Sequence, residues 1–367
     1  MELTKCKLGE LITQRREKND SSNLPICGVS KDGLIPPKQI DADTSIYNVF
    51  YRDDFIFNPA RMELNSIAIN DKYDRAICSS LYEVFFVHRT DLLLPHYLKL
   101  IVKQKWFTRY CEFLGQGSAR EYCRFNNISE IEIEFPSVEV QQRIVDYYSS
   151  IQKRIVLKKQ INDNLEATAQ AYFDNLFFSC DDTDCTLADI ALVNPSRPLS
   201  KGVEARCFDM STLPTSGCIP TGDTTKPYNG GVRFINGDTL IARITPCLEN
   251  GKAAYINILN EGEVAFGSTE YIVFASKNDI PSCFYYFLIR NSKFVTFSLQ
   301  FMNGSSGRQR VSGEELASFP LMTPSKEKLA AFNKVGKLVL EQMKEATDEI
   351  QFLKQLQETI TATLSSR

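Results

Sequence analysis

The sequence has few of the residues from which metal and nucleophile sites are usually built. Its only histidines are His88 and His96, and its eleven cysteines include no Cys-x-x-Cys pair. Zinc sites and cysteine–histidine catalytic pairs are built from these residues, so the sequence offers few candidates for either kind of site. We interpret the scattered cysteines as reduced, mostly buried thiols and expect no metal site.

Long apolar runs are also missing. No stretch reaches the ~18 consecutive apolar residues of a membrane-spanning helix. The start, MELTKCKLGELI, lacks the basic segment and apolar core of a secretory signal. We therefore expect a cytoplasmic protein without a membrane partner.

Enzyme motifs are not found either. The nearest matches to the Asn/Asp-Pro-Pro-aromatic motif of amino-methyltransferases are NPAR (58–61) and NPSR (194–197), which we interpret as turns. There is no Walker A sequence and no Gly-x-Ser-x-Gly. These absences favour a non-catalytic binding protein that holds no cofactor of its own.

The net charge of −3 excludes only a globally basic nucleic-acid binder. A local basic patch or a basic partner would still allow the chain to bind nucleic acid. Hydrophobic residues make up 43% of the chain and charged residues 24%, as in ordinary globular proteins. A length of 367 residues suggests two or three domains.

What the sequence does contain is an internal repeat. Arg120 aligns with Arg308, 188 positions later, and the same shift aligns Pro136 with Pro324. Within the copies, β-type runs occupy 66–69, 82–87, 231–235 and 270–275, and helical stretches occupy 95–114 and 281–300. The pattern predicts two similar globular domains of mixed α/β (α+β) class.

Each copy ends in a long stretch without proline, 138–178 and 326–364, in which Gly336 is the only glycine. Apolar residues recur there at alternating spacings of four and three, which predicts a coiled coil. The alternative is two ordinary amphipathic helices, each packed on its own domain. The residues expected to pair the helices are Ile144, Ile151, Leu165, Tyr172, Leu176, Phe332, Gly336, Val339, Ile350, Leu353, Ile360 and Leu364.

An antiparallel pairing of these helices gives the duplicated chain a pseudo-two-fold axis. The register that opposes Ile144 to Leu364 also opposes Tyr172 to Gly336, a large residue to the smallest. We therefore expect two similar globular domains separated by two long antiparallel helices.

The strongest candidate binding residues lie in two equivalent loops, 115–124 and 303–310. Glycine and serine let the backbone approach phosphates, and arginine binds phosphate or a guanine edge. The alternative is a pair of polar hairpins with solvated arginines. The candidate DNA-binding residues are Gln116, Arg120, Arg124, Arg308, Gln309 and Arg310.

A second basic segment occurs once in each copy. It carries Asn58 and Arg61 in the first copy and Arg243 and Lys252 in the second. We include these four residues as DNA-binding candidates. The alternative is that they are exposed hairpin charges.

Taken together, these features resemble the specificity subunit of type I restriction-modification systems. The resemblance rests on GQGSAR (115–120), FPSVEVQQRI (135–144), NGSSGR (303–308) and the segment from Pro320 to Pro324, and it covers essentially the whole chain. One departure is that SKEKLAAF, after Pro324, lacks the expected Glu-Gln pair.

The resemblance implies the following organisation and role. Domains would span 1–136 and 179–324, with spacer helices at 137–178 and 325–367. Each domain would read one half of a bipartite DNA target, and the helices would set the spacer and dock two methyltransferase (modification) subunits. Those partners would use S-adenosylmethionine for adenine-N6 methylation, and any restriction subunit would use ATP and Mg²⁺. The alternatives are the specificity chain of a related split methyltransferase-nuclease and a coiled-coil scaffold without a DNA role.

Overall fold

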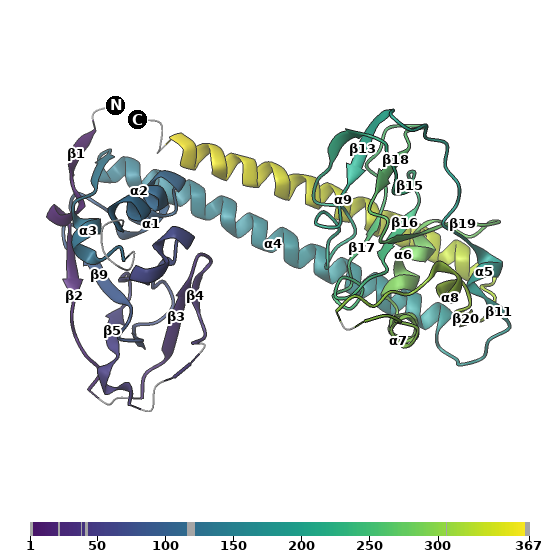
Figure 1. Ribbon diagram of the computed structural model, residues 1–367, viewed down its shortest axis with the longest axis horizontal. Coiled ribbons are helices and arrows are strands. Elements are labelled where there is room, and N and C mark those ends of the chain that lie inside the picture. The colour runs from purple at the N-terminus through teal and green to yellow at the C-terminus, as the bar shows by residue number, and fades with distance from the viewer. Residues whose placement is uncertain are drawn as a thin grey trace. The chain divides into compact units, whose positions relative to one another are not determined.

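The computed structural model describes residues 3–20, 23–37, 39–40, 43–115, 122–305 and 307–363. The chain divides into two compact units. Unit 1 comprises Met1–Arg154 and Leu353–Arg367, and unit 2 comprises Ile155–Phe352. Both units mix helices and strands, which Figure 1 labels in chain order.

Unit 1 is built on two four-stranded sheets. One has the order β2-β9-β6-β7 and the other β4-β3-β8-β5, with only β3 and β8 paired in parallel. The strands are β2 (Ile12–Arg15), β3 (Ile26–Ser30), β4 (Gly33–Ile35), β5 (Asn48–Tyr51), β6 (Phe55–Phe57), β7 (Ile67–Ile69), β8 (Arg75–Cys78) and β9 (Glu83–Val87). Separately, β1 (Thr4–Lys7) pairs antiparallel with β10 (Glu132–Phe135). This ladder joins the two ends of the segment from β1 to β10, which we call the first module.

Unit 2 repeats this topology strand for strand. Its sheets have the orders β12-β19-β16-β17 and β14-β13-β18-β15, again with one parallel pair, β13 with β18, and a separate β11-β20 ladder. The strands are β11 (Cys185–Thr186), β12 (Ala191–Val193), β13 (Glu204–Phe208), β14 (Thr224–Pro227), β15 (Val232–Phe234), β16 (Thr239–Ala242), β17 (Ala253–Tyr255), β18 (Ala265–Gly267), β19 (Tyr271–Ser276) and β20 (Pro320–Leu321). The predicted pair of similar α/β domains is confirmed.

Shorter helices follow the same plan in both units. Unit 1 contains α1 (Pro95–Val102), α2 (Lys105–Gly115), α3 (Phe125–Ser129) and the 3-10 turns η1 (Leu8–Glu10), η2 (Thr44–Ile46) and η3 (Pro59–Leu64). Unit 2 contains α5 (Leu187–Ile190), α6 (Cys283–Arg290), α7 (Ser292–Gln300) and α8 (Gly313–Ala317).

The helical stretches predicted at 95–114 and 281–300 were wrong in one respect, because each is broken into two helices. Asn291 has extended backbone angles, and its side chain accepts hydrogen bonds from the amides of Lys293 and Phe294, so it ends α6 and caps α7. In unit 1, the break follows α1 at Lys103, whose side-chain Nζ donates to the carbonyls of Lys31 and Ile67.

Aromatic side chains dominate the core of unit 2. Phe173 of the first long helix lies 5.0 Å from both Phe284 and Phe332, measured between ring centroids. Helix α6 is buried along seven consecutive residues, Cys283 to Ile289. Burial on all sides indicates a helix enclosed by other elements, and this core fixes the long helices to the rest of unit 2.

The proline-free stretches form two long helices, α4 (Val138–Phe177) and α9 (Lys326–Thr363). In unit 2, Lys158 Nζ lies 2.7 Å from a carboxylate oxygen of Glu349, and the Tyr172 and Phe332 rings lie 6.2 Å apart. Residue numbers rise along α4 as their partners' numbers fall along α9. The helices are therefore antiparallel, as predicted.

Unit 1 contains the other parts of the two helices, and there too they are paired through polar contacts. The buried Gln357 of α9 donates to Gln152 Oε1 of α4 at 3.0 Å. Gln104, between α1 and α2, donates to the carbonyl of Thr361 at 2.8 Å.

The heptad positions of α9 are largely buried. Buried positions are Phe332, Gly336, Val339, Met343, Ala346, Ile350, Leu353 and Gln357, while Ile360 is half-buried. On α4, half-buried positions include Ile144, Ile151, Leu165, Tyr172 and Leu176. Leu364 lies outside the described residues.

The structure pairs Tyr172 with α9 near Gly336, the residue that the expected register places opposite it. Tyr172 contacts Phe332, one turn before Gly336. A Cβ at Gly336 would meet the Phe332 ring at 2.8 Å and Cys283 Sγ at 3.1 Å. The core formed by α6 therefore sets the space at this position.

We expect Gly336→Leu to lower the free energy of unfolding by about 1–3 kcal/mol, because the added side chain must displace Phe332 and Cys283. Chemical denaturation of the full chain measures this change. Val335→Leu, at the exposed neighbouring position, is the control and should change stability little. Equal effects of the two variants would contradict the assigned crowding.

Candidate nucleic-acid interface

In unit 2 the two basic segments predicted separately lie against each other. One is the turn 243–252 between β16 and β17, and the other is the 303–311 hairpin between α7 and α8. The amide of Thr245 donates to the Gln309 carbonyl at 3.0 Å, and the amide of Val311 donates to the Arg243 carbonyl at 3.0 Å. The candidate residues of both segments therefore share one surface region of the unit.

The 303–311 hairpin presents Arg308 at an exposed turn. Asn303 and Arg310 close the hairpin by exchanging two backbone hydrogen bonds of 3.0 and 2.8 Å. Gly304 and Gly307 have φ angles of +129° and +77°, which glycine adopts most readily. Within the described part of the chain, the Arg308 side chain forms no hydrogen bond or ion pair.

Arg310 is held by Glu270, the residue before β19. Its Nε lies 2.9 Å from Glu270 Oε2, and its Nη2 lies 2.7 Å from Oε1. These hydrogen bonds are the main cause that lowers the pKa of Glu270. The carboxylate therefore stays ionised and keeps the guanidinium in one orientation.

Arg243 and Lys252 are not the exposed hairpin charges of the alternative interpretation. Both are half-buried. Lys252 Nζ donates to the Met210 carbonyl at 2.6 Å, so its ammonium group is held within the unit. Arg243 Nε is buried and has no hydrogen-bond partner among the described residues.

Unit 1 brings its two candidate segments together in the same way. The amide of Cys123 donates to the Pro59 carbonyl at 3.0 Å. Asn58 caps η3 by accepting from the amide of Ala60, and Arg61 is exposed. Gln116 and Arg120 lie outside the described residues.

Arg124 also meets a glutamate, but through a single contact. Its Nη1 lies 3.3 Å from Glu83 Oε1, and the other Glu83 oxygen accepts from the amide of Phe125 at 2.7 Å. Each unit thus pairs a loop arginine with a carboxylate at the start of an equivalent strand, β9 or β19. The sequence analysis did not identify either glutamate, because the pairing joins residues far apart in the chain.

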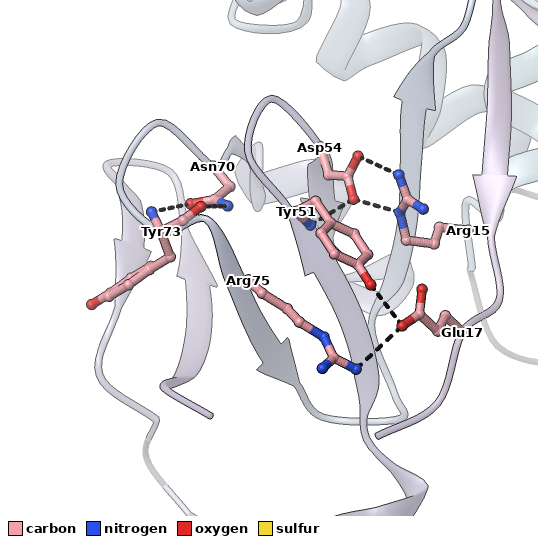
Figure 2. A network of polar contacts seen from close by, with 7 residues as sticks. All are labelled: Arg15, Glu17, Tyr51, Asp54, Asn70, Tyr73 and Arg75. Carbon is pink, nitrogen blue, oxygen red and sulfur yellow. Dashed lines mark hydrogen bonds and ion pairs between the residues drawn. The ribbon is translucent and has the colours of Figure 1, made fainter. Parts of the chain in front are cut away.

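A buried arginine–aspartate pair is a second feature that the sequence analysis missed. In unit 1, Arg15 binds both carboxylate oxygens of Asp54, at 2.6 and 3.1 Å, and Figure 2 shows Asp54 also accepting from the Tyr51 amide. In unit 2, Arg197 and Asp238 form the corresponding pair at 2.7 and 3.3 Å. These residues are offset by 182 and 184 positions, so the shift of 188 does not align them.

Around this pair, unit 1 has a wider polar network (Figure 2). The Tyr51 hydroxyl donates to Glu17 Oε1 at 2.8 Å, and Arg75 lies 3.4 Å from the same oxygen. The network joins the segment after β2 to strands β5 and β8. It therefore orients the second sheet against the first.

The described part of the chain contains neither a metal cluster nor a membrane-spanning helix. No three His, Cys, Asp or Glu side chains among the described residues are grouped to hold a metal ion. No described helix is long and apolar enough to cross a membrane.

Comparison with known proteins identifies relatives for both repeats. Residues 4–167 and 221–362 match the family model of the type I restriction modification DNA specificity domain. The crystal structure of the type I restriction-modification S subunit from M. genitalium has a TM-score of 0.62 and 14% identity, covering 99% of this chain and 96% of that one. At that identity the structural likeness shows the fold alone.

Sequence relatives cover shorter segments. The Escherichia coli EcoEI specificity subunit is 28% identical over 198 residues, 49% of this chain and 32% of the relative. The E. coli EcoAI specificity subunit is 30% identical over 141 residues, 37% of this chain and 24% of the relative. The matches thus span a third or less of these relatives. Because the family model itself covers most of both repeats, the chain belongs to the type I restriction-modification DNA specificity domain family.

Proposed function

We propose that this chain is the DNA-specificity subunit of a type I restriction-modification complex and that each unit reads one half of a bipartite target. The observation that carries the proposal is the recurrence of one loop arrangement in both units. In each, a loop arginine lies beside a second candidate segment and meets a strand-initial glutamate. Two similar but unequal surfaces suit two different half-sites.

The proposed division of labour assigns affinity to phosphate contacts and specificity to base-edge contacts. Arg308, exposed and without a described side-chain partner, suits a phosphate. Arg310, oriented by a carboxylate, suits a defined base contact, whereas Arg124 meets its carboxylate through one contact. The net charge of −3 fits a protein whose DNA-binding surface is local.

We further propose that methyltransferase subunits dock on α4 and α9. Large apolar side chains are exposed on both helices in unit 2, among them Leu157 (56% exposed), Ile161, Leu338 and Phe352 (63% exposed). Leu157 and Ile161 lie one turn apart and so share one side of α4. Exposed apolar strips on long helices are typical of surfaces that a partner covers.

In this proposal the chain is non-catalytic. The modification subunits would bind S-adenosylmethionine and methylate adenine, and any restriction subunit would use ATP and Mg²⁺. The helices would set the spacer between the half-sites. Because the proposed substrate is cellular or invading DNA, we expect the complex to act in the cytoplasm.

The decisive experiment is co-expression of this chain with a methyltransferase subunit from the same genome, followed by mapping of methylated adenines. We expect one bipartite motif with two different halves and a fixed spacer. The methyltransferase without this chain is the control and should give no such motif. Failure of the pair to methylate any defined motif would contradict the proposed function.

Arg308→Ala tests the hairpin directly. Because Arg308 is assigned to a phosphate, we expect DNA binding by the complex to weaken about equally for all sequences, with a salt dependence shallower by about one phosphate contact. Lys201→Ala, which removes a cation from another exposed turn of unit 2, is the control. Unchanged affinity and salt dependence in Arg308→Ala would show that the hairpin is only a turn. The same expectation applies to Arg120→Ala in unit 1, at a position outside the described residues.

A further inference from the structure

The inference concerns Arg310 and rests on the proposed function. A guanidinium carries five N–H groups, one on Nε and two on each terminal nitrogen. Nε and one N–H of Nη2 are taken by Glu270, at 2.9 and 2.7 Å. One N–H of Nη1 is taken by the Arg308 carbonyl at 3.2 Å. One N–H therefore remains on each terminal nitrogen.

The proposal requires the Arg308 carbonyl to accept the Nη1 N–H on the Cδ side, so that the two remaining N–H groups are parallel and form a two-donor edge. Bidentate recognition of guanine in the major groove requires two parallel donors directed at the O6 and N7 acceptors. The Arg310 side chain is 41% exposed, and Glu270 occupies the edge formed by Nε and Nη2. The other base pairs do not present two adjacent acceptors in the major groove from one base.

We propose that Arg310 reads a guanine in the half-site bound by unit 2 and that Glu270 is the positioning residue that orients it. Glu270 holds one edge of the guanidinium, and the Arg308 carbonyl holds a third donor. The guanidinium is thus oriented before DNA arrives, and less side-chain entropy is lost on binding.

Stability alone is a weak explanation for the ion pair. Glu270 is 26% exposed and Arg310 41% exposed, and pairs so exposed to solvent add at most about 1 kcal/mol. The hairpin is already closed by backbone hydrogen bonds between Asn303 and Arg310. The side-chain geometry therefore serves orientation more than hairpin closure.

In unit 1 the glutamate holds the loop arginine less firmly. Arg124 has one contact with Glu83, at 3.3 Å, and its side chain is 65% exposed. It lacks the two-point hold on one edge that Arg310 has. We therefore restrict the guanine assignment to unit 2.

The test uses the complex of the full chain with its methyltransferase subunits. Once the bipartite motif is mapped, each guanine of the half-site assigned to unit 2 is replaced in turn by 7-deazaguanine, which lacks the N7 acceptor. We expect wild-type binding to fall about 10-fold at one position. Arg310→Met, which keeps an unbranched side chain and removes the donors, should bind the natural site more weakly and lose the sensitivity to 7-deazaguanine.

Glu270→Gln tests the positioning residue. We expect discrimination at that guanine to fall at least several-fold, while discrimination at the other positions stays as in the wild type. The control is Asp223→Asn, which neutralises the partner of Arg206, another arginine of unit 2 held at 2.7 and 3.2 Å by a similarly exposed carboxylate. It should leave every position unchanged.

Three outcomes would overturn the inference while leaving the proposed function intact. They are a half-site without guanine, a wild-type complex indifferent to 7-deazaguanine, and an Arg310→Met complex that remains sensitive to it. If Arg310→Met does not assemble, Glu270→Gln in the same assay decides the matter. Absence of any defined methylated motif would instead refute the proposed function.

Discussion

Replacing residues 1–135 by the first module of another family member is expected to change one half of the methylated motif and leave the other half and the spacer intact. The module is closed in the structure because its terminal strands, β1 and β10, pair with each other. Its core cluster draws chiefly on residues of that module, with Ile144 and Val145 of α4 packed against it.

The junction with α4 also favours a clean exchange. The buried Gln141 side chain donates to the carbonyls of Leu92 and Pro136 at 2.7 and 2.8 Å and accepts from the Leu94 amide. All three partners are backbone groups, so a module of different sequence and the same fold can offer them. The retained helix should therefore receive a foreign module without losing its anchor.

Sequencing of methylated adenines in cells that carry the exchanged chain measures the outcome. The reciprocal exchange of the second module is the matched control and should alter only the other half of the motif. If either exchange changes both halves together, the assignment of one half-site to each unit is wrong.

Asp54→Ala is expected to lower the free energy of unfolding by about 2–4 kcal/mol. Asp54 is 3% exposed, and its loss would leave Arg15 and the Tyr51 amide without their acceptor. Breaking one partner out of a buried ion pair typically costs about 3–5 kcal/mol. The lower range reflects the partial exposure of Arg15, which also lies over the rings of Tyr51 and Phe86.

The folded structure both opposes and favours ionisation of Asp54. Burial raises the pKa of this carboxyl above its usual value, more than the hydrogen bonds from Arg15 lower it. A carboxyl whose folded pKa is raised contributes stability that is fully present below the unfolded pKa and is lost as the pH rises through the folded pKa. Asp54 should therefore not drive unfolding in acid.

A double variant separates the two effects. We expect Arg15→Met with Asp54→Leu to recover much of the stability lost in Asp54→Ala, because no charge is then left buried. Denaturant unfolding at neutral pH measures both variants, and Asp54→Asn is the isosteric control. A double variant no more stable than Asp54→Ala would show that the pair itself is needed for the fold.

Some of these elements follow from local sequence. The alternation of four- and three-residue spacings without proline indicated α4 and α9, because helical periodicity depends on neighbours within a few turns. Four β-type runs became β7, β9, β15 and β19. The shift of 188 residues joins β9 to β19 and β10 to β20, and so revealed the duplication.

A fixed shift fails where the copies differ in length. The buried pairs Arg15–Asp54 and Arg197–Asp238 occupy corresponding places at shifts of 182 and 184. The helix break at Asn291 was also not predicted. In a continuous helix the amides of Lys293 and Phe294 would donate to backbone carbonyls one turn earlier, whereas here they donate to the Asn291 side chain.

By itself, the sequence determined that this protein is a duplicated α/β chain with two long helices and arginine-bearing loops. Only the tertiary structure decided what those loops contact. Glu270 and Arg310 are forty residues apart and meet because the hairpin lies across the start of β19. Tyr172 meets Phe332, and Gly336 meets Cys283, because α6 packs against the helices. Such contacts depend on how distant segments pack, a property that local spacing does not encode.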